Sequence, residues 1–222
     1  MNGQPAVRVV SVNVGLPRTV EWHDRNVESG IWKTPVDGRV AVRGVNLDGD
    51  EQADLRVHGG PDKAVYAYAA EDYEWWSEEL GRALEPGTFG ENLTVRGVDL
   101  GGAVIGTRWR VGTTVLQVAQ PRLPCFKLGM RIGDASFVDE FDLAGRFGAY
   151  FRILEEGVVG VGDAIEIEAP RPDGITVLEL GRAEHRAFPE LVARVLADPD
   201  VPEGWKHWAE RQQRRAQEGT DR

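Results

Sequence analysis

The sequence has almost no cysteine, since Cys125 is the single thiol among its 222 residues. One cysteine cannot close a disulfide within the chain, which excludes a disulfide-stabilised scaffold and a cysteine-rich zinc site. A reducing compartment tolerates such cysteine usage, so we expect a cytoplasmic protein. The four histidines show no spacing typical of metal ligands.

Long apolar runs are also missing. The sequence contains no stretch of about 18 apolar residues, the length that spans a bilayer as a helix. Residues 1–8 lack the basic run followed by an apolar stretch that begins a signal peptide. We therefore expect neither a membrane span nor a secretion signal.

Positive charge is in deficit. Lys and Arg number 26 against 36 Asp and Glu, which gives a formal net charge of −10. Such a surface repels phosphate backbones and anionic lipid, so we expect no nucleic acid and no membrane as partners. Arg122, Lys127 and Arg131 nevertheless make one segment cationic. This local charge favours a small anionic ligand, although unrelated surface charges would give the same pattern.

Short strands dominate the first three-quarters of the chain. Val10, Val12 and Val14 alternate with polar residues, and many similar runs are separated by some of the 27 glycines. A Pro- and Gly-rich run at residues 170–174 then marks a boundary. Beyond it we expect three short helices. The prediction is a mostly β barrel or sandwich over residues 1–170, interrupted by one helix, and a small helical appendage over residues 171–222.

The strongest local signal surrounds Cys125. Pro121 and Pro124 stiffen the loop that presents it. Arg122 and Lys127 flank the thiol, and nearby cations stabilise a thiolate, which is both nucleophile and metal ligand. Residue types alone leave open the alternative that Cys125 is a small, inert, buried side chain.

Two further segments could line a site. The glycines of His58-Gly59-Gly60-Pro61-Asp62-Lys63 allow a backbone to approach an anion, and His58 and Lys63 could add donors. Asn92, in Phe89–Thr94, could donate and accept in a cleft. Taken alone, either segment is explained better by a tight turn without a ligand.

Taken in order, these segments resemble the MOSC domain, and within that superfamily the stand-alone YiiM type. The matching residues, which run from about Val12 to Glu168, include Gly30-Ile31-x-Lys33, Asn46-Leu47-x-Gly49-Asp50, His58-Gly59-Gly60-Pro61-Asp62-Lys63-Ala64, Phe89-Gly90-Glu91-Asn92-Leu93 and Gln120-Pro121-Arg122-x-Pro124-Cys125-x-Lys127-Leu128.

The resemblance implies a MOSC-type β-barrel that binds the molybdenum cofactor, with Cys125 as the metal ligand and the catalytic residue. It also implies a set of side chains and glycines around the pterin and its phosphate. These are Lys33, His58, Gly59, Gly60, Lys63, Asn92, Arg122 and Lys127.

The implied activity is reduction of N-hydroxylated small molecules, such as hydroxylaminopurines, to amines. The sequence shows no flavin, haem or iron–sulfur motif, so a separate flavoprotein or ferredoxin-type reductase is expected to supply the electrons. Two alternatives remain at this point. Cys125 could carry a persulfide in sulfur transfer, or the chain could be a non-catalytic carrier of the cofactor.

Overall fold

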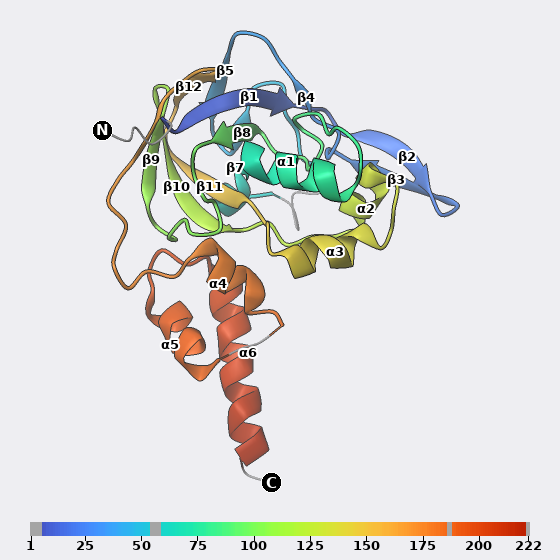
Figure 1. The fold of residues 1–222 in the computed structure, drawn as a ribbon. Coiled ribbons are helices and arrows are strands. Elements are labelled where there is room, and N and C mark those ends of the chain that lie inside the picture. Colours follow the sequence, from blue (N-terminus) through green and yellow to red (C-terminus); the bar gives the residue numbers. More distant parts are fainter. Residues whose placement is uncertain (1–5, 54–58, 186–187, 221–222) are drawn as a thin grey trace.

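The computed structural model describes residues 6–53, 59–185 and 188–220, with side chains as far as residue 218 (Figure 1). Its strands are β1 (Arg8–Val14), β2 (Arg18–Trp22), β3 (Arg25–Ser29), β4 (Thr34–Pro35), β5 (Arg39–Arg43), β6 (Asn46–Leu47), β7 (Val65–Ala69), β8 (Leu93–Arg96), β9 (Arg108–Val111), β10 (Thr114–Pro121), β11 (Ala149–Glu155), β12 (Gly157–Gly160) and β13 (Ile165–Ile167). Its helices are α1 (Ala70–Glu79), α2 (Phe126–Ile132), α3 (Phe137–Ala144), α4 (Val177–Arg182), α5 (Pro189–Ala197), α6 (Glu203–Thr220) and the 3-10 turn η1 (Pro61–Lys63).

Eight strands form the central sheet, in the order β13-β9-β10-β11-β7-β8-β1-β4. Neighbouring strands are antiparallel except β7 and β8, which are parallel. A parallel pair needs a crossover connection, and α1 lies in that connection. Strand β10 is buried along its whole length, including its polar residues Thr114, Gln117 and Gln120. A three-stranded sheet of β12, β5 and β6 and the β2–β3 hairpin complete the strands of the described residues.

The prediction of a mostly β barrel is not confirmed, because the chain is mixed α/β. About 31% of it is strand and 29% helix. Within the described residues, an isolated bridge joins Arg8 of β1 to Ala164 beside β13, but the edge strands β13 and β4 do not pair with each other, so the sheet is not a closed barrel. The difference arises largely from α2 and α3, which follow the Cys125 loop. Their short apolar stretches do not distinguish strand from helix by periodicity.

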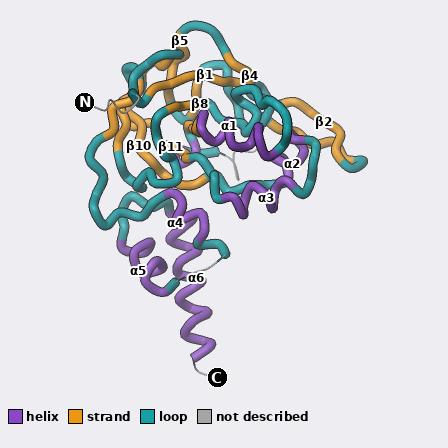
Figure 2. Tube along the Cα trace, viewed as in Figure 1, coloured by secondary structure: helices purple, strands orange, loops and turns teal. Residues whose placement is uncertain are grey.

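The helices expected in the last quarter are confirmed as α4, α5 and α6. They lie together on one side of the sheet, and α6 runs away from it to the C-terminus (Figures 1 and 2). A capping box between Thr176 and Glu179 starts α4. Whether residues 1–170 and 171–222 are separate domains stays a prediction.

Two apolar clusters hold these layers together. The larger joins the sheet to the C-terminal helices and includes Trp205 and Trp208 of α6. The smaller is rich in aromatic rings, such as Tyr68 and Phe89 with centroids 4.5 Å apart, and packs α1, α2 and α3 against the sheet. The Cys125 loop connects β10 to α2, so it lies where the sheet meets this aromatic cluster.

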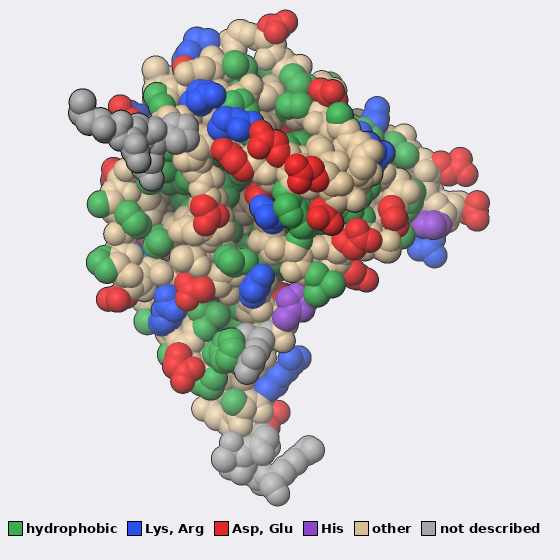
Figure 3. Space-filling model, in the orientation of Figure 1, with side chains coloured by type: hydrophobic (Ala, Val, Ile, Leu, Met, Phe, Trp, Pro, Cys, Tyr) green, Lys and Arg blue, Asp and Glu red, His purple; other side chains and the backbone are tan. Residues whose placement is uncertain are grey.

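The outer surface carries acidic and basic side chains interspersed, as the visible face in Figure 3 shows. No helix in the described part of the chain is both long and apolar enough to cross a membrane.

Candidate functional site

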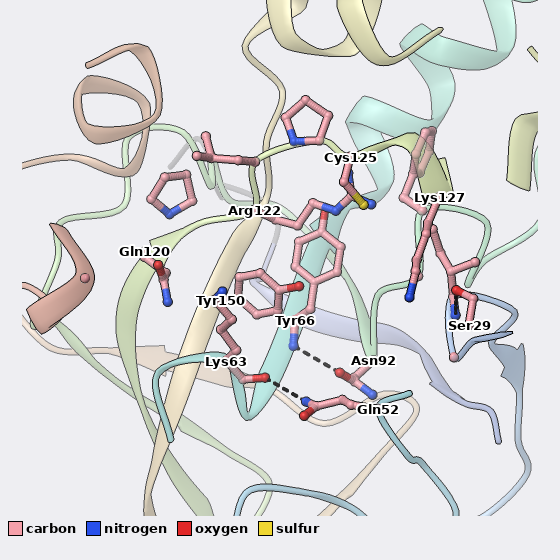
Figure 4. Close-up of a pocket in the computed structure, with 18 of the residues that line it drawn as sticks. Ser29, Gln52, Lys63, Tyr66, Asn92, Gln120, Arg122, Cys125, Lys127 and Tyr150 are labelled. Carbon is pink, nitrogen blue, oxygen red and sulfur yellow. Dashed lines mark hydrogen bonds between the residues drawn. The ribbon is translucent and has the colours of Figure 1, made fainter. Parts of the chain in front are cut away.

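A pocket of about 400 Å³ opens beside the Cys125 loop (Figure 4). Its walls come from distant parts of the chain: the end of the β2–β3 hairpin, residues 51–53, the end of η1, strands β7, β10 and β11, and helix α6. The volume falls within the usual range for small-molecule sites.

Most of the predicted site residues meet in this pocket. Its lining includes Lys33, Lys63, Asn92, Arg122, Cys125 and Lys127. Gly59 and Gly60 are described but are not among the lining residues, and His58 lies outside the described residues. Gly60 has a φ of 94° and caps η1, so it shapes the turn that leads to Lys63.

Cys125 is partly exposed and lines the pocket. Its backbone is extended, with φ −139° and ψ 168°, and α2 begins at the next residue. The Cys125 carbonyl accepts a hydrogen bond from Leu128 N at 2.8 Å, which fixes the loop to α2. The thiol therefore faces a cavity rather than an apolar core, while its role as a metal ligand stays a prediction.

Arg122 brings a buried donor without a partner among the described residues to the pocket. Only 6% of the residue is exposed, and its guanidinium lies over the Phe141 ring at 5.5 Å. Its Nη1 is fully buried and has no hydrogen-bond partner in the part of the chain that the structure describes. Because an unpaired buried donor is costly, a ligand oxygen at this point would stabilise the site.

Lys33 is held at the pocket floor by Asp50. The two side chains form an ion pair that is almost completely buried. Burial lowers the pKa of Lys33, and the neighbouring Asp50 opposes that shift. Asp50 also accepts hydrogen bonds from Gly15 N and from the Asn92 side chain, both at 2.9 Å.

Asn92 has a structural part in this floor. Its Oδ1 accepts from Tyr66 N at 3.1 Å, and its Nδ2 donates to Asp50 (Figure 4). A longer bond of 3.4 Å joins Nδ2 to the Asn13 carbonyl. These bonds use both donors of the amide, so Asn92 lines the pocket but aligns β7 with the floor rather than offering a free donor.

Lys127 and Lys63 complete the cationic side. Lys127 Nζ donates to the Glu28 carbonyl at 3.0 Å and ties α2 to β3. The Lys63 carbonyl accepts from Gln52 Nε2 at 3.1 Å, the second bond drawn in Figure 4. Burial lowers the pKa of Lys63.

Behind the floor, Glu91 is fully buried. Its Oε1 accepts from Gly87 N at 2.6 Å, the Tyr73 hydroxyl at 2.7 Å and the Thr94 hydroxyl at 2.8 Å. Its Oε2 has no partner among the described residues. Burial raises the pKa of Glu91, and the hydrogen bonds to Oε1 act in the opposite direction.

The sequence did not point to several lining residues. Tyr66 and Tyr150 lie with ring centroids 5.0 Å apart, and burial raises the pKa of both. The Tyr66 hydroxyl donates to the Phe147 carbonyl at 2.9 Å. From α6, Trp205 and Trp208 line the pocket, although their helical spacing predicted only a buried face. Spacing along a helix does not reveal which cavity that face meets.

Comparison with known sequences assigns the site to a family. Residues 54–166, which include Lys63, Asn92, Arg122 and Cys125, match the MOSC domain. The chain belongs to the MOSC domain family. Within this MOSC family it is of the YiiM type: it is 32% identical over 182 residues to the protein YiiM of Escherichia coli, covering 80% of this chain and 81% of that protein.

Other relatives extend the match over nearly the whole MOSC chain. The uncharacterised protein YflK of Bacillus subtilis is 40% identical over 205 residues, 91% of this chain and 93% of YflK. The crystal structure of YiiM from Geobacillus stearothermophilus has a TM-score of 0.77 at 29% identity, covering 92% of this chain and 98% of that one. A protein named reductase from Gibberella moniliformis is 34% identical over 153 residues, which are 66% of this chain but 27% of the reductase.

Proposed function

We propose that this MOSC protein binds the molybdenum cofactor in the pocket beside Cys125 and reduces N-hydroxylated compounds to amines. Family membership, the YiiM relatives and the relative named reductase support this assignment. The observation that carries it is the combination of a partly exposed thiol and an unpaired buried guanidinium nitrogen in one pocket.

The residues present fit an anionic, pterin-bearing metal cofactor. The described part of the chain has no cluster of three or more His, Cys, Asp or Glu side chains able to hold a bare metal ion. A soft thiolate such as that of Cys125 suits a redox metal. Arg122, with its unpaired Nη1, and the ammonium groups of Lys63 and Lys127 would hold the phosphate, since charged donors bind phosphate strongly.

The overall reaction converts R–NH–OH, two electrons and two protons into R–NH₂ and water. The bound cofactor would supply the oxygen-removing redox chemistry. The chain's own contribution is to orient the substrate, exclude water and hold protons. Lys33 Nζ, which is ion-paired with Asp50, and the hydroxyl of Tyr150 are proton-bearing groups of residues that line the pocket. Helix α6 closes one side of the pocket and limits the access of water there.

A separate flavoprotein or ferredoxin-type reductase would supply the two electrons, in the cytoplasm. Both the partner and the location rest on the sequence. The partner follows from the absence of a redox-cofactor motif, and the location follows from the single cysteine.

The test uses full-length protein from a host that makes the cofactor, compared with Cys125→Ser. We expect stoichiometric molybdenum in the wild type, its loss in the variant, and amine formation from a hydroxylaminopurine with a chemical reductant in the wild type alone. Molybdenum without turnover would indicate a cofactor carrier rather than an enzyme. A persulfide on Cys125, detected by mass spectrometry in metal-free protein, would indicate sulfur transfer.

A further inference from the structure

The pocket has two chemically different sides. The cationic side consists of Lys63 at the end of η1, Arg122 in the Cys125 loop and Lys127 in α2. The other side comes from α6 and consists of Gly204, the aromatic side chains of Trp205 and Trp208, and one further cation, Arg211. Helix α6 lies outside residues 54–166, the segment that matches the MOSC domain. The cofactor anchors and the α6 wall therefore come from different parts of the chain.

The spacing of the α6 residues shows which way position 204 points. Residues 204, 208 and 211 follow one another at i, i+4 and i+7, so they lie on one face of the helix. Trp208 and Arg211 on that face line the pocket. A side chain added at position 204 would therefore project toward the same cavity.

Hydrogen bonds connect the α6 wall, formed by Gly204, Trp205, Trp208 and Arg211, to the strand that precedes the Cys125 loop. Trp205 Nε1 donates to Gln120 Oε1 at 3.0 Å, and Gln120 Nε2 donates to the Asp62 carbonyl at 3.1 Å. The Trp205 and Trp208 rings meet edge to face with centroids 5.7 Å apart. Gln120 is on β10, and β10 leads into the loop of Cys125. The bond from Trp205 to Gln120 therefore ties the α6 wall to the strand that positions the thiol.

Gly204 is a glycine that packing does not require. A Cβ built at this position meets no heavy atom within 4 Å, and its φ is outside the left-handed region. By contrast, a Cβ at Gly181 in α4 would lie 2.5 Å from the Phe147 ring. No close packing contact therefore explains a glycine at position 204.

We propose that Gly204 is a specificity-determining position that keeps the α6 side of the pocket open to ring-bearing substrates. The inference rests on the proposed reductase function. Bicyclic N-hydroxylated compounds would lie against the Trp205–Trp208 wall and fill the space beside Gly204. Small N-hydroxylated compounds would not reach that space.

The test compares Gly204→Leu with Gly204→Ala and with Gln213→Leu. Gln213 is exposed and lies two and a half turns after residue 204, so it places the same leucine on the opposite face of α6. The substrates are a hydroxylaminopurine and N-methylhydroxylamine, with a chemical reductant. Molybdenum content and the melting temperature are measured for every protein.

We expect Gly204→Leu to lower kcat/KM for the hydroxylaminopurine by about 10-fold or more, chiefly through KM, since filling a pocket by a few methylenes has effects of this size. Turnover of N-methylhydroxylamine, molybdenum content and melting temperature should stay at wild-type values. The kcat/KM of Gly204→Ala for the hydroxylaminopurine should lie between the values of the wild type and Gly204→Leu, and that of Gln213→Leu should match the wild type.

Equilibrium dialysis of an aminopurine, the product, gives a second readout that needs no turnover. Gly204→Leu should weaken its binding, and Gln213→Leu should not. Equal effects of Gly204→Leu on large and small substrates, unchanged aminopurine binding, or no aminopurine binding by the wild type would overturn the proposal. A wild type that holds no molybdenum contradicts the reductase function instead, and the dialysis result still decides the role of Gly204.

Discussion

The floor of the pocket and its cationic side satisfy their buried polar groups in opposite ways. On the floor, Asp50 accepts hydrogen bonds from Lys33, Gly15 and Asn92, so the charges are paired within the protein. On the cationic side, Arg122 is as deeply buried as Asp50, yet its Nη1 has no partner among the described residues. The floor therefore stabilises the fold, and the cationic side keeps a donor that a ligand could satisfy.

The largest expected effect concerns the floor. Asp50→Ala leaves the Lys33 ammonium buried without its counter-charge, and breaking a buried pair in this way costs about 3–5 kcal/mol. Urea unfolding followed by circular dichroism measures the loss. Asp48→Ala is the matched control, because Asp48 pairs with Arg43 on the surface and such pairs contribute about 1 kcal/mol or less. Equal losses in the two variants would refute the distinction between floor and surface.

A second effect concerns Glu91, which extends the floor. Burial raises its pKa in the folded protein, so the folded state binds more protons than the unfolded state between pH 4.5 and that raised value. Stability therefore falls as the pH rises through this window, by roughly 1.4 kcal/mol for each pH unit that separates the folded and unfolded pKa values. Glu91→Gln removes the titration.

The measurement for Glu91 is the unfolding free energy as a function of pH. The difference between Glu91→Gln and the wild type should move in favour of the variant as the pH is raised from about 4.5, the ordinary pKa of a glutamate carboxyl. Parallel stability curves for the two proteins would show that this carboxyl does not titrate with a raised pKa.

The smallest effect on stability is expected on the cationic side of the pocket. Arg122→Met removes a buried charge whose Nη1 has no partner among the described residues, and it keeps an apolar stem against Phe141. The lost contact with the ring and the relieved desolvation oppose each other, so the unfolding free energy of the cofactor-free protein should change by about 1 kcal/mol or less. A loss of unfolding free energy as large as that of Asp50→Ala would show that Arg122 stabilises the fold in the way that Asp50 does.

Local pattern was enough to predict part of the fold. The C-terminal helices follow from apolar spacing and from the Pro/Gly run before them, and α4 to α6 are where that spacing places them. Helices α2 and α3 and the open edges of the sheet were not predicted. Short apolar stretches are ambiguous between helix and strand, and sheet closure depends on pairing between strands far apart in sequence.

The candidate site shows the same limit. Motifs identified Cys125, Arg122 and Lys63, and the fold brings them to one pocket. The part that Asn92 has in the floor could not be predicted, because its partners Tyr66 and Asp50 are 26 and 42 positions away in the chain. The α6 wall was equally hidden, since only the folded chain shows that Trp208 meets the cavity.

The contrast between the floor and the cationic side is tested most directly by the molybdenum content of Arg122→Met. The wild type and the variant are purified from the same cofactor-producing host, and the cofactor-free forms are melted in parallel. We predict stoichiometric molybdenum in the wild type, little in the variant, and closely similar melting temperatures. Full molybdenum in Arg122→Met would contradict the claim that the unpaired guanidinium is the anchor for the ligand.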